Sequence, residues 1–471
     1  MNTTNNRLEA DVLIIGWGKG AGHMAAELSR RGRRVVLVEQ SERMYGGTCP
    51  NVGCVPSKGL VHRSGNRRAT DPPQEYYERA VREVQATREL MRLANYEALQ
   101  GVENVGIVIG RAAFVDPHTV AVESGAGPAW ITAQTILINT GSEPVIPDIP
   151  GLRDSRRTVT STDLLESTVL PGRLAILGGG YVGLEFASIY RGFGSEVSLF
   201  ERAPGILATE DREIAAIAAR ILTEGGIDIL LDAQVTEVRD GDAEAVVVYE
   251  IGGDRRTVGA DAVLAASGRA PSTGRLGLEA AGIRVGKHGA IEVDGYLQTS
   301  QPHIYALGNV NGGPQHTYIS FDDTRIVLDQ LVGDGHRSTA DRVAVPRTLF
   351  ITPPFASVGL TEEQAREAGY QLKIATQPIA DIAAMPRAYA VDETRGAMKF
   401  VIDAQTDEIL GAALLSIDAQ ELINTVALAM RHGVTAAELR DAIYTHPSST
   451  EAFNDVLGTI VRSDELVGEL A

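Results

Sequence analysis

Two glycine-rich turns, each between a strand-like and a helix-like segment, constrain the fold of this chain more than any other feature. The first turn, residues 16–21, reads GWGKGA; the apolar run ADVLIIG leads into it, and the helix-like HMAAELSRRG and the strand-like RVVLVE follow. In such a turn Gly16 and Gly18 allow a tight bend and close approach of a pyrophosphate, and Ala21 takes the third, helix-packing position. The pattern predicts a βαβ dinucleotide-binding unit.

A second copy of this pattern spans residues 173–201. Its strand, RLAILGGG, leads into the helix-like VGLEFASIYRGFG and the strand EVSLFE. The turn between them carries Gly178, Gly180 and Gly183 in the order GGGYVG. Two such units predict that the chain binds two nucleotides. The alternative is a pair of glycine turns that only join packed elements.

An acidic residue ends each copy. Glu39 and Glu201 each lie 23 residues after the first glycine of their unit. A carboxylate at this place accepts hydrogen bonds from ribose hydroxyls and repels a 2′-phosphate. Glu201 therefore predicts NADH rather than NADPH at the second site, although the neighbouring Arg202 leaves NADPH possible.

The rest of the chain divides into segments of different character. A helical pattern runs from Tyr76 to Leu99, a proline-rich connector ends near Gly151, and strands predominate after about Val345, where Thr361 and Gln364 form a helix-capping box. The chain of 471 residues is long enough for about three domains. These features predict an α/β protein with two Rossmann-like dinucleotide-binding domains and a C-terminal α+β domain.

Composition excludes several classes of partner. The net charge of −18 and the sequence pI near 5.0 argue against nucleic acid and anionic membrane surfaces. Residues 1–9 lack the pattern of a signal peptide, and no run of about 18 apolar residues exists. We therefore expect a cytoplasmic protein that acts on small molecules.

Only two cysteines occur, Cys49 and Cys54. An undistorted helix separates residues five apart by about 7.5 Å along its axis, and bridged cysteine Cα atoms lie roughly 4.4–6.8 Å apart. Pro50, Gly53 and Pro56 would distort a helix here, which makes a reducible disulfide plausible. A zinc site lacks ligands, since His62 alone lies nearby, so we predict no metal centre. Two inert thiols are the remaining alternative.

The segment around these cysteines, GGTCPNVGCVPSK at residues 46–58, resembles the active-site signature of the class I pyridine nucleotide-disulfide oxidoreductases. This family includes dihydrolipoamide dehydrogenase, glutathione reductase and mercuric reductase. The resemblance extends over INTGSEP, ASGRAP, the strand before Asn309 and THPSSTE. It implies FAD-binding segments at 1–151 and 271–345, an NAD(P)-binding domain at 152–270 and a dimerisation domain at 346–471. Further implied cofactor-binding residues are Gly47, Thr48, Thr140, Gly141 and Gly268.

The resemblance also implies roles at the redox centre. Cys49 would be the exposed thiol that attacks substrate, and Cys54 the thiol that faces the flavin. Lys58 would pair with Glu185 beside flavin N5, and Tyr181 would cover the nicotinamide pocket.

A proton donor and a dimer follow from the same resemblance. His446 would exchange a proton with Cys49, oriented by Glu451, and would come from the partner subunit of a homodimer. The unperturbed pKa of imidazole, about 6.5, suits this work. The alternative is a surface histidine before a proline turn. Asn309 stands where the family usually has aspartate, so we expect FAD binding to weaken but persist; a turn-favouring asparagine without a ligand role is the alternative.

The C-terminal segment separates this chain from two members of the family. Mercuric reductases and large thioredoxin reductases use a second, C-terminal cysteine pair, and residues 463–471 contain none. In MYGGTC, DDTRIVLDQL and TPPFASVGLTEEQAREAG the chain is most similar to the bacterial reactive-chlorine-resistance flavoproteins, described as hypothiocyanous acid reductases and, in part, copper(II) reductases.

The resemblance therefore predicts a reductase that passes electrons from NAD(P)H through FAD and the cysteine pair to a small oxidant. One alternative is dihydrolipoamide dehydrogenase. Another is a flavin-bearing redox sensor or complex subunit without turnover, against which the predicted proton donor His446 counts.

Overall fold

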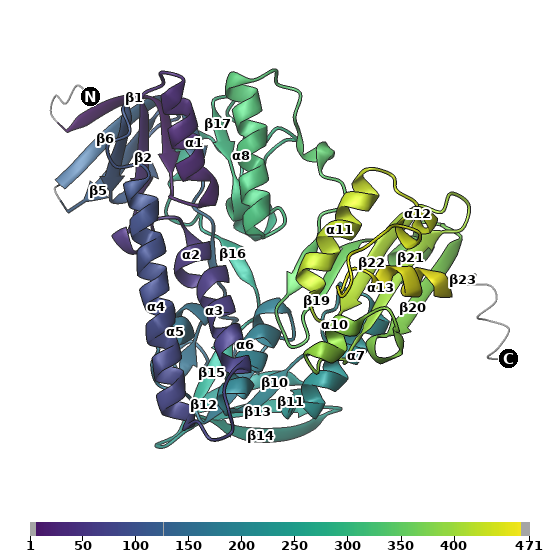
Figure 1. Cartoon of the computed structure of the whole chain (residues 1–471). Coiled ribbons are helices and arrows are strands. Elements are labelled where there is room, and N and C mark those ends of the chain that lie inside the picture. The colour runs from purple at the N-terminus through teal and green to yellow at the C-terminus, as the bar shows by residue number, and fades with distance from the viewer. Residues whose placement is uncertain (1–5, 126, 463–471) are drawn as a thin grey trace.

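The computed structural model describes residues 6–125 and 127–462. Residues 463–471, which contain no second cysteine pair, lie outside the described residues. Residues 1–5, part of the segment without a signal-peptide pattern, also lie outside them. Figure 1 shows the elements in chain order, with the long helix α4 (Pro73–Glu97) and the C-terminal sheet on opposite sides of the molecule.

The first glycine turn follows β1, a central strand of a seven-stranded sheet. The strand order is β3-β2-β1-β6-β5-β4, and β17 also pairs with β6. The strands β1, β2, β3, β6 and β17 pair in parallel, because each connection crosses over the sheet. The bounds are β1 Arg7–Ile15, β2 Val35–Glu39, β3 Val105–Ile109, β4 Arg111–Phe114, β5 Thr119–Ser124, β6 Gly127–Ile138 and β17 Ile304–Ala306.

Helices of this unit carry the redox segment and pack beside the sheet. The predicted helix at residues 76–99 is observed as α4, which begins at Pro73, a residue suited to the first helical turn. Because β17 pairs with β6, the chain returns to the first sheet after leaving it. The other helices are α1 Lys19–Arg30, α2 Thr48–Val52, α3 Cys54–Gly65 and α8 Thr317–Val332.

The second glycine turn belongs to a five-stranded parallel sheet of order β11-β10-β9-β15-β8. An antiparallel three-stranded sheet, β12-β13-β14, lies beside it (Figure 1). A short ribbon of β7 and β16 joins the two nucleotide units. The bounds are α5 Ser161–Glu166, α6 Tyr181–Phe193, α7 Arg212–Glu224, β7 Ser142–Pro144, β8 Thr158–Val159, β9 Arg173–Leu177, β10 Glu196–Phe200, β11 Ile227–Leu230, β12 Gln234–Asp240, β13 Ala245–Ile251, β14 Asp254–Ala260, β15 Ala262–Ala265 and β16 Arg269–Pro271.

The C-terminal unit is a mixed α+β layer, as predicted. Its sheet has the order β18-β19-β22-β21-β20-β23, and every pair is antiparallel. Thr361 and Gln364 form the predicted capping box of α9. The bounds are α9 Glu362–Glu367, α10 Pro386–Ala390, α11 Ala419–Arg431, α12 Ala436–Arg440, α13 Ala452–Val456, β18 Arg347–Leu349, β19 Phe355–Gly359, β20 Leu372–Pro378, β21 Ala397–Asp403, β22 Ile409–Leu415 and β23 Val461–Arg462.

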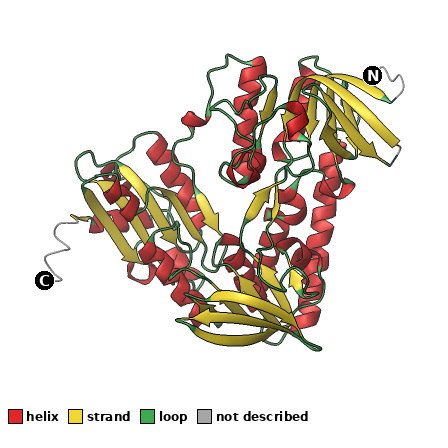
Figure 2. Cartoon of the chain, turned by 180° about the vertical axis from the view of Figure 1, so that it is seen from behind, coloured by secondary structure: helices red, strands yellow, loops and turns green. Residues whose placement is uncertain are grey.

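Several apolar cores underlie these units, and one of them joins α3 and α4, the second unit and the C-terminal sheet. One core lies between the first sheet and α1 and α8, and another fills the C-terminal sheet and its helices. Figure 2, seen from behind, shows helices beside each of the sheets. The architecture confirms the predicted α/β class with two Rossmann-like units and a C-terminal α+β unit. Among the helices in the described ranges, none has both the length and the apolarity to cross a membrane.

Candidate functional site

One large cavity joins the two glycine turns, the cysteine pair and the C-terminal unit. Its volume is about 2000 Å³. A cavity of this size exceeds the usual range for a single drug-sized ligand, about 300–1,000 Å³. The predicted site residues that line it are Gly18, Thr48, Cys49, Cys54, Lys58, Gly141, Gly178, Gly180, Tyr181, Glu185, Glu201, Gly268 and Asn309.

The first turn fits a dinucleotide. Gly16 has φ +94°, and a Cβ there would lie 2.5 Å from the backbone oxygen of Asn139; a Cβ on Gly18 would lie 2.2 Å from Asn139 Oδ1. Only glycine therefore fits at either place. Asn139 Oδ1 is buried without a hydrogen-bond partner within the chain, so it is available to a ligand donor. These features match the requirements of FAD at this turn.

Glu39 lies at the end of β2, as predicted. Its Oε2 accepts a hydrogen bond from the Trp17 backbone N–H at 2.8 Å, and its Oε1 accepts one from Ser41 N–H at 3.1 Å. Burial raises the pKa of Glu39, and the backbone donors oppose this shift. The carboxylate is thus fixed beside the turn, where a ribose would lie.

The second turn repeats this arrangement. Gly178 has φ +121°, and a Cβ on Gly183 would lie 1.9 Å from the Gly178 oxygen, whereas the space beside Gly180 is open. The helix thus packs closely on the strand at Gly183 while Gly180 leaves room for phosphates. Glu201 accepts hydrogen bonds from Gly179 N–H and from the N–H of residue 203, both at 2.8 Å.

The remaining predicted cofactor residues surround these turns. Gly47 caps α2 at φ +77°, and a Cβ there would lie 2.7 Å from Gly18 Cα, so the redox segment packs directly on the first turn. Thr140 Oγ1 donates to the Ser272 oxygen at 3.0 Å, which ties the connector to the returning segment. Ala21 is buried within α1, in the helix-packing place that the sequence predicts.

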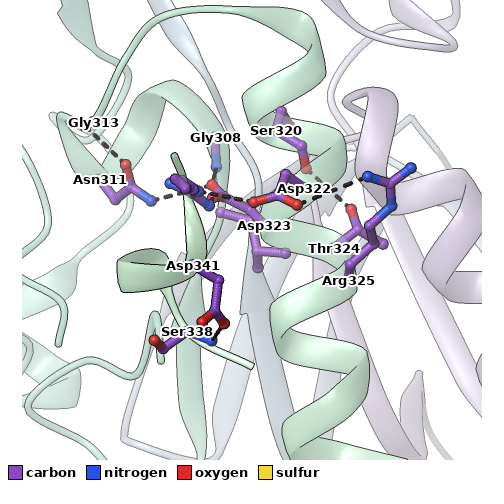
Figure 3. Close-up of polar contacts among 12 residues, drawn as sticks. Gly308, Asn311, Gly313, Ser320, Asp322, Asp323, Thr324, Arg325, Ser338 and Asp341 are labelled. Atoms are coloured by element: carbon purple, nitrogen blue, oxygen red, sulfur yellow. Dashed lines mark hydrogen bonds and ion pairs between the residues drawn. The ribbon is translucent and has the colours of Figure 1, made fainter. Parts of the chain in front are cut away.

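Asn309 follows a turn that a buried aspartate holds. Asn309 Nδ2 donates to Ser142 Oγ at 2.9 Å. The backbone N–H of Gly308, at φ +72°, donates to Asp323 Oδ2 at 2.6 Å (Figure 3). Asp323, on α8, is fully buried and pairs with Arg342. Asp323 therefore places Asn309 at the cavity wall, a contact that the sequence analysis missed.

The two cysteines lie on either side of a helix break, as the prolines and glycines predict. Helix α2 ends at Val52. The next residue, Gly53, has a φ of −138° and a ψ of −122°, which are not helical, and α3 begins at Cys54. Both thiols are free, and each shifts the pKa of the other. Cys49 is half-buried and Cys54 is exposed, and both thiols line the large cavity.

The environment of the pair favours a thiolate at Cys54. The hydrogen bond from Cys49 lowers the pKa of Cys54 to about 5, with help from Thr317 and from the positive charge of Lys58. Thr317 Oγ1 lies 3.4 Å from Cys54 Sγ. The same thiol–thiol bond and burial raise the pKa of Cys49. Because the thiolate is the reactive form, Cys54 is prepared to hold negative charge against the cavity.

Lys58 and Glu185 form the predicted ion pair across two domains. Lys58 Nζ lies 2.8 and 2.9 Å from the two carboxylate oxygens of Glu185. The backbone N–H of Phe350 donates to Glu185 at 3.1 Å, and Lys58 Nζ lies 4.7 Å from the centroid of the Phe350 ring. The pair thus joins α3 of the first unit, α6 of the second and the start of the C-terminal sheet.

Tyr181 begins α6 beside the second turn and lines the cavity. Its hydroxyl donates to Glu210 Oε1 at 3.0 Å. Burial and the negative charge of Glu210 raise the pKa of Tyr181, so the hydroxyl keeps its proton. The ring lines the same cavity as the second nucleotide turn and the cysteine pair, and its role as a cover for the nicotinamide pocket stays a prediction.

His446 and Glu451 form the predicted hydrogen-bonded pair, with Nδ1 2.9 Å from Oε2. Backbone N–H of Ser448 also donates to Glu451, and these bonds lower the pKa of that carboxylate. The His446 side chain is 72% exposed. Neither residue lies among the residues that line the cavity of this chain, so one subunit does not bring His446 to Cys49.

No group of three or more His, Cys, Asp or Glu side chains arranged to hold a metal ion occurs within residues 6–125 and 127–462. Several residues that the sequence analysis missed do line the cavity: His316, Thr317, Tyr318, Phe350, Arg347 and Glu210. No motif signals them, because they come from segments that only the fold brings together.

Two family models match the parts of the chain that carry these residues. Residues 10–324 match the model described as pyridine nucleotide-disulphide oxidoreductase. Residues 345–457 match the model of the dimerisation domain of the same group. Both nucleotide turns, both cysteines and the Lys58–Glu185 pair fall in the first match, and His446 with Glu451 falls in the second.

Individual relatives agree with these matches. The chain is 43% identical to the Escherichia coli pyridine nucleotide-disulfide oxidoreductase RclA, over 95% of this chain and 98% of that protein. It is 35% identical to a Staphylococcus aureus mercuric reductase, covering 94% and 80% of the two chains. It is 33% identical to a Geobacillus stearothermophilus dihydrolipoyl dehydrogenase, covering 96% and 97%.

A solved structure agrees over nearly the full length. The Cu(II) complex of the HOCl-induced flavoprotein disulfide reductase RclA from Escherichia coli superposes with a TM-score of 0.90 at 42% identity, covering 96% of this chain and 99% of that one. The chain thus shares its fold with a family whose members use FAD and NAD(P)H. The chain belongs to the pyridine nucleotide-disulphide oxidoreductase family.

Proposed function

We propose that the protein is an NADH-preferring reductase that passes two electrons through FAD and the Cys49–Cys54 pair to a small oxidant, with hypothiocyanous acid or Cu(II) as the substrate class. The observation that carries the proposal is the single cavity that joins both nucleotide turns to the two thiols. RclA, with 42% identity, is described as HOCl-induced and as a Cu(II) complex, which supports an oxidant of this class.

The cofactor residues have separate tasks in this proposal. The first turn and Glu39 would hold FAD, with Asn309 and Lys58 near its flavin end. The second turn and Glu201 would hold the nicotinamide nucleotide. FAD, when bound, accepts hydride from the nicotinamide and delivers two electrons to a disulfide. Boundaries near residues 151, 270 and 345 would separate these tasks along the chain.

The chain's own residues would then carry the thiol chemistry. Cys49 gives its proton to His446 of the partner subunit, and the resulting thiolate attacks the sulfur of hypothiocyanous acid; an S–S bond forms, the S–O bond breaks and the departing hydroxide takes that proton back and leaves as water. The Cys54 thiolate attacks Cys49 sulfur and releases thiocyanate. Overall, NADH and HOSCN give NAD⁺, thiocyanate and water.

A homodimer completes this proposal. His446 is exposed and held by Glu451, and it belongs to the segment that matches a dimerisation domain. A second copy would place this histidine against Cys49. The proton donor and the nucleophile would then come from different subunits.

The test of the substrate class is a comparison of oxidants. Steady-state NADH and NADPH oxidation by the FAD-loaded protein would be measured with HOSCN, Cu(II), Hg(II), glutathione disulfide and lipoamide. We expect the highest kcat/KM for HOSCN or Cu(II), because both reach a thiol directly. Cys49→Ser is the control, and its turnover should fall to background.

Other outcomes of this comparison would contradict the proposal. Rapid oxidation of dihydrolipoamide with NAD⁺ would identify a dihydrolipoamide dehydrogenase, the function of a relative with 33% identity. Absence of turnover with every oxidant, in spite of full FAD loading, would favour a redox sensor.

Replacing Glu201 with alanine is expected to lower the NADH-to-NADPH ratio of kcat/KM by about tenfold or more. Glu201 is fixed by two backbone N–H groups, and hydrogen bonds to a charged group contribute about 1.5–3 kcal/mol. The ratio should fall because the ribose loses its acceptor and a 2′-phosphate loses its repulsion. Steady-state kinetics with both nucleotides measure it.

Glu196→Ala is the matched control for this change. Glu196 is the first residue of β10, the strand that Glu201 follows, and its side chain is exposed. The control should leave the ratio unchanged. A wild-type enzyme that prefers NADPH, or an unchanged ratio in Glu201→Ala, would disprove the assigned role.

A further inference from the structure

We propose that Glu210 is a positioning residue that latches Tyr181 in its closed position over the nicotinamide pocket, and that the C-terminal unit holds this latch in place. The inference rests on the proposed function, since it takes Tyr181 as the ring that must move when the nicotinamide binds. It adds a carboxylate outside the sequence segments that carry the resemblance to the control of nucleotide entry.

The contacts of Glu210 identify it as the partner of the ring. Its side chain is 2% exposed. Glu210 Oε1 accepts the Tyr181 hydroxyl at 3.0 Å and lies 3.2 Å from Arg347 Nε. Glu210 Oε2 accepts the Ser357 hydroxyl at 2.7 Å. Both oxygens are therefore occupied, by one guanidinium and two hydroxyl donors, as a buried carboxylate requires.

The backbone around Glu210 is fixed, so the ring is the movable partner. Glu210 N–H donates to the Leu207 oxygen at 2.9 Å, and Leu207 N–H donates to the Gly179 oxygen at 3.1 Å. The latch is thus tied to the second glycine turn itself. The guanidinium of Arg212 also donates a hydrogen bond to the backbone oxygen of Glu210 at 2.8 Å.

A buried ion pair next to the latch fixes it against the C-terminal unit. Asp211 caps α7 and lies 3.2 Å from Lys399 Nζ of β21, and both side chains are 5% exposed. Lys399 also pairs with Glu213 and Glu362 at 2.9 and 2.7 Å. Arg347 lies on β18 and Ser357 on β19. The two other partners of the Glu210 carboxylate therefore belong to the same C-terminal sheet.

This geometry links ring opening to the loss of one strong hydrogen bond. When Tyr181 turns aside to admit the nicotinamide, its hydroxyl leaves a buried, charged acceptor. A hydrogen bond of this kind changes an equilibrium by roughly ten- to a hundredfold. If only a small fraction of the protein has the ring in the open position, the apparent affinity for the nucleotide is the affinity of the open state multiplied by that fraction. Loss of the latch should therefore strengthen nucleotide binding.

The experiment measures NAD⁺ binding to the oxidised FAD holoenzyme by calorimetry, where no turnover occurs. Tyr181→Phe keeps the ring and removes only the hydroxyl, and Glu210→Gln keeps the shape and removes the charge. We expect both variants to bind NAD⁺ about tenfold more tightly than the wild type. The double variant should bind no more tightly than Tyr181→Phe alone, because both changes remove the same bond.

A kinetic readout separates the latch from a structural role. Rapid-mixing measurement of flavin reduction should show a lower apparent Kd for NADH in both variants, with the limiting rate within about twofold of the wild type. Glu224→Gln removes an exposed carboxylate at the end of α7 that contacts neither Tyr181 nor the ion pairs of Lys399, and it should change neither quantity. Thermal unfolding of each variant reports folding, and Tyr181→Phe tests the inference even where Glu210→Gln is unstable.

Several results would overturn the latch. Unchanged NAD⁺ affinity in Tyr181→Phe, or additive effects in the double variant, would contradict it. These failures differ from failure of the proposed function, in which the wild-type flavin is not reduced by NADH or NADPH at all.

Discussion

Replacing Cys54 with serine is expected to lower NAD(P)H-driven turnover by on the order of 10³-fold or more, because residues of a catalytic unit contribute together. FAD should remain bound. The thiol of Cys54 opens onto the large cavity and has a lowered pKa, so its thiolate should give long-wavelength absorption with oxidised flavin. Serine cannot supply this band. Anaerobic NADH titration, followed by absorbance, measures both the band and the flavin content.

Cys49→Ser is the matched control for this change. It should also lose turnover, yet keep the long-wavelength band because Cys54 is intact. Since the pKa of Cys54 lies at about 5 in the dithiol, the band in wild-type enzyme should persist through neutral pH and fade as pH falls through this value. A band that survives in Cys54→Ser would reject the assignment of the flavin-facing thiol.

Replacing His446 with alanine is expected to slow transfer from the reduced cysteine pair to the oxidant by about 10²–10⁴-fold, the usual contribution of a general acid or base. Flavin reduction by NADH should remain as in the wild type, because His446 lies outside the cavity of its own chain. Rapid mixing measures the two half-reactions separately. The difference between them is the signature of a proton donor for Cys49.

Two further variants make this test specific. Glu451→Gln should cause a smaller loss in the same half-reaction, since it keeps a hydrogen bond to His446 Nδ1 but removes the charge that stabilises imidazolium. His336→Ala changes another exposed histidine and should have no effect. Equal loss of both half-reactions in His446→Ala would show that the residue has another role.

The same variants test the arrangement of the subunits. If His446 acts across a dimer, mixing Cys49→Ser with His446→Ala subunits should restore one active site in the mixed dimer, since that site has both intact groups. Recovery of activity on mixing would support the homodimer. The measurement requires only that subunits exchange on denaturation and refolding together.

Local sequence was sufficient for the parts of the site whose geometry is set by neighbours in the chain. The glycine turns follow from backbone that must bend at positive φ and pack without a Cβ. The break between α2 and α3 follows from Pro50, Gly53 and Pro56, which disrupt a continuous helix. The capping box at Thr361 is equally local. In each case the cause lies within a few residues of the effect.

The resemblance to a family added pairs that are far apart in the chain. Lys58 and Glu185 are separated by 127 residues, and their contact is observed as the resemblance implies. The roles of the two thiols, Cys49 toward the substrate and Cys54 toward the flavin, stay predictions from the resemblance, and both thiols line the cavity that the fold creates.

Patterns in the chain were therefore enough to predict the two nucleotide-binding units and the redox segment, and the family resemblance indicated the class of chemistry. Which side chains tune that chemistry became visible in the folded protein. Thr317 reaches Cys54 across 263 residues, Asp323 fixes the turn before Asn309, and Glu210 meets Tyr181 and the C-terminal sheet. The physical reason is that hydrogen bonds and buried charges depend on distances of about 3 Å, which folding sets.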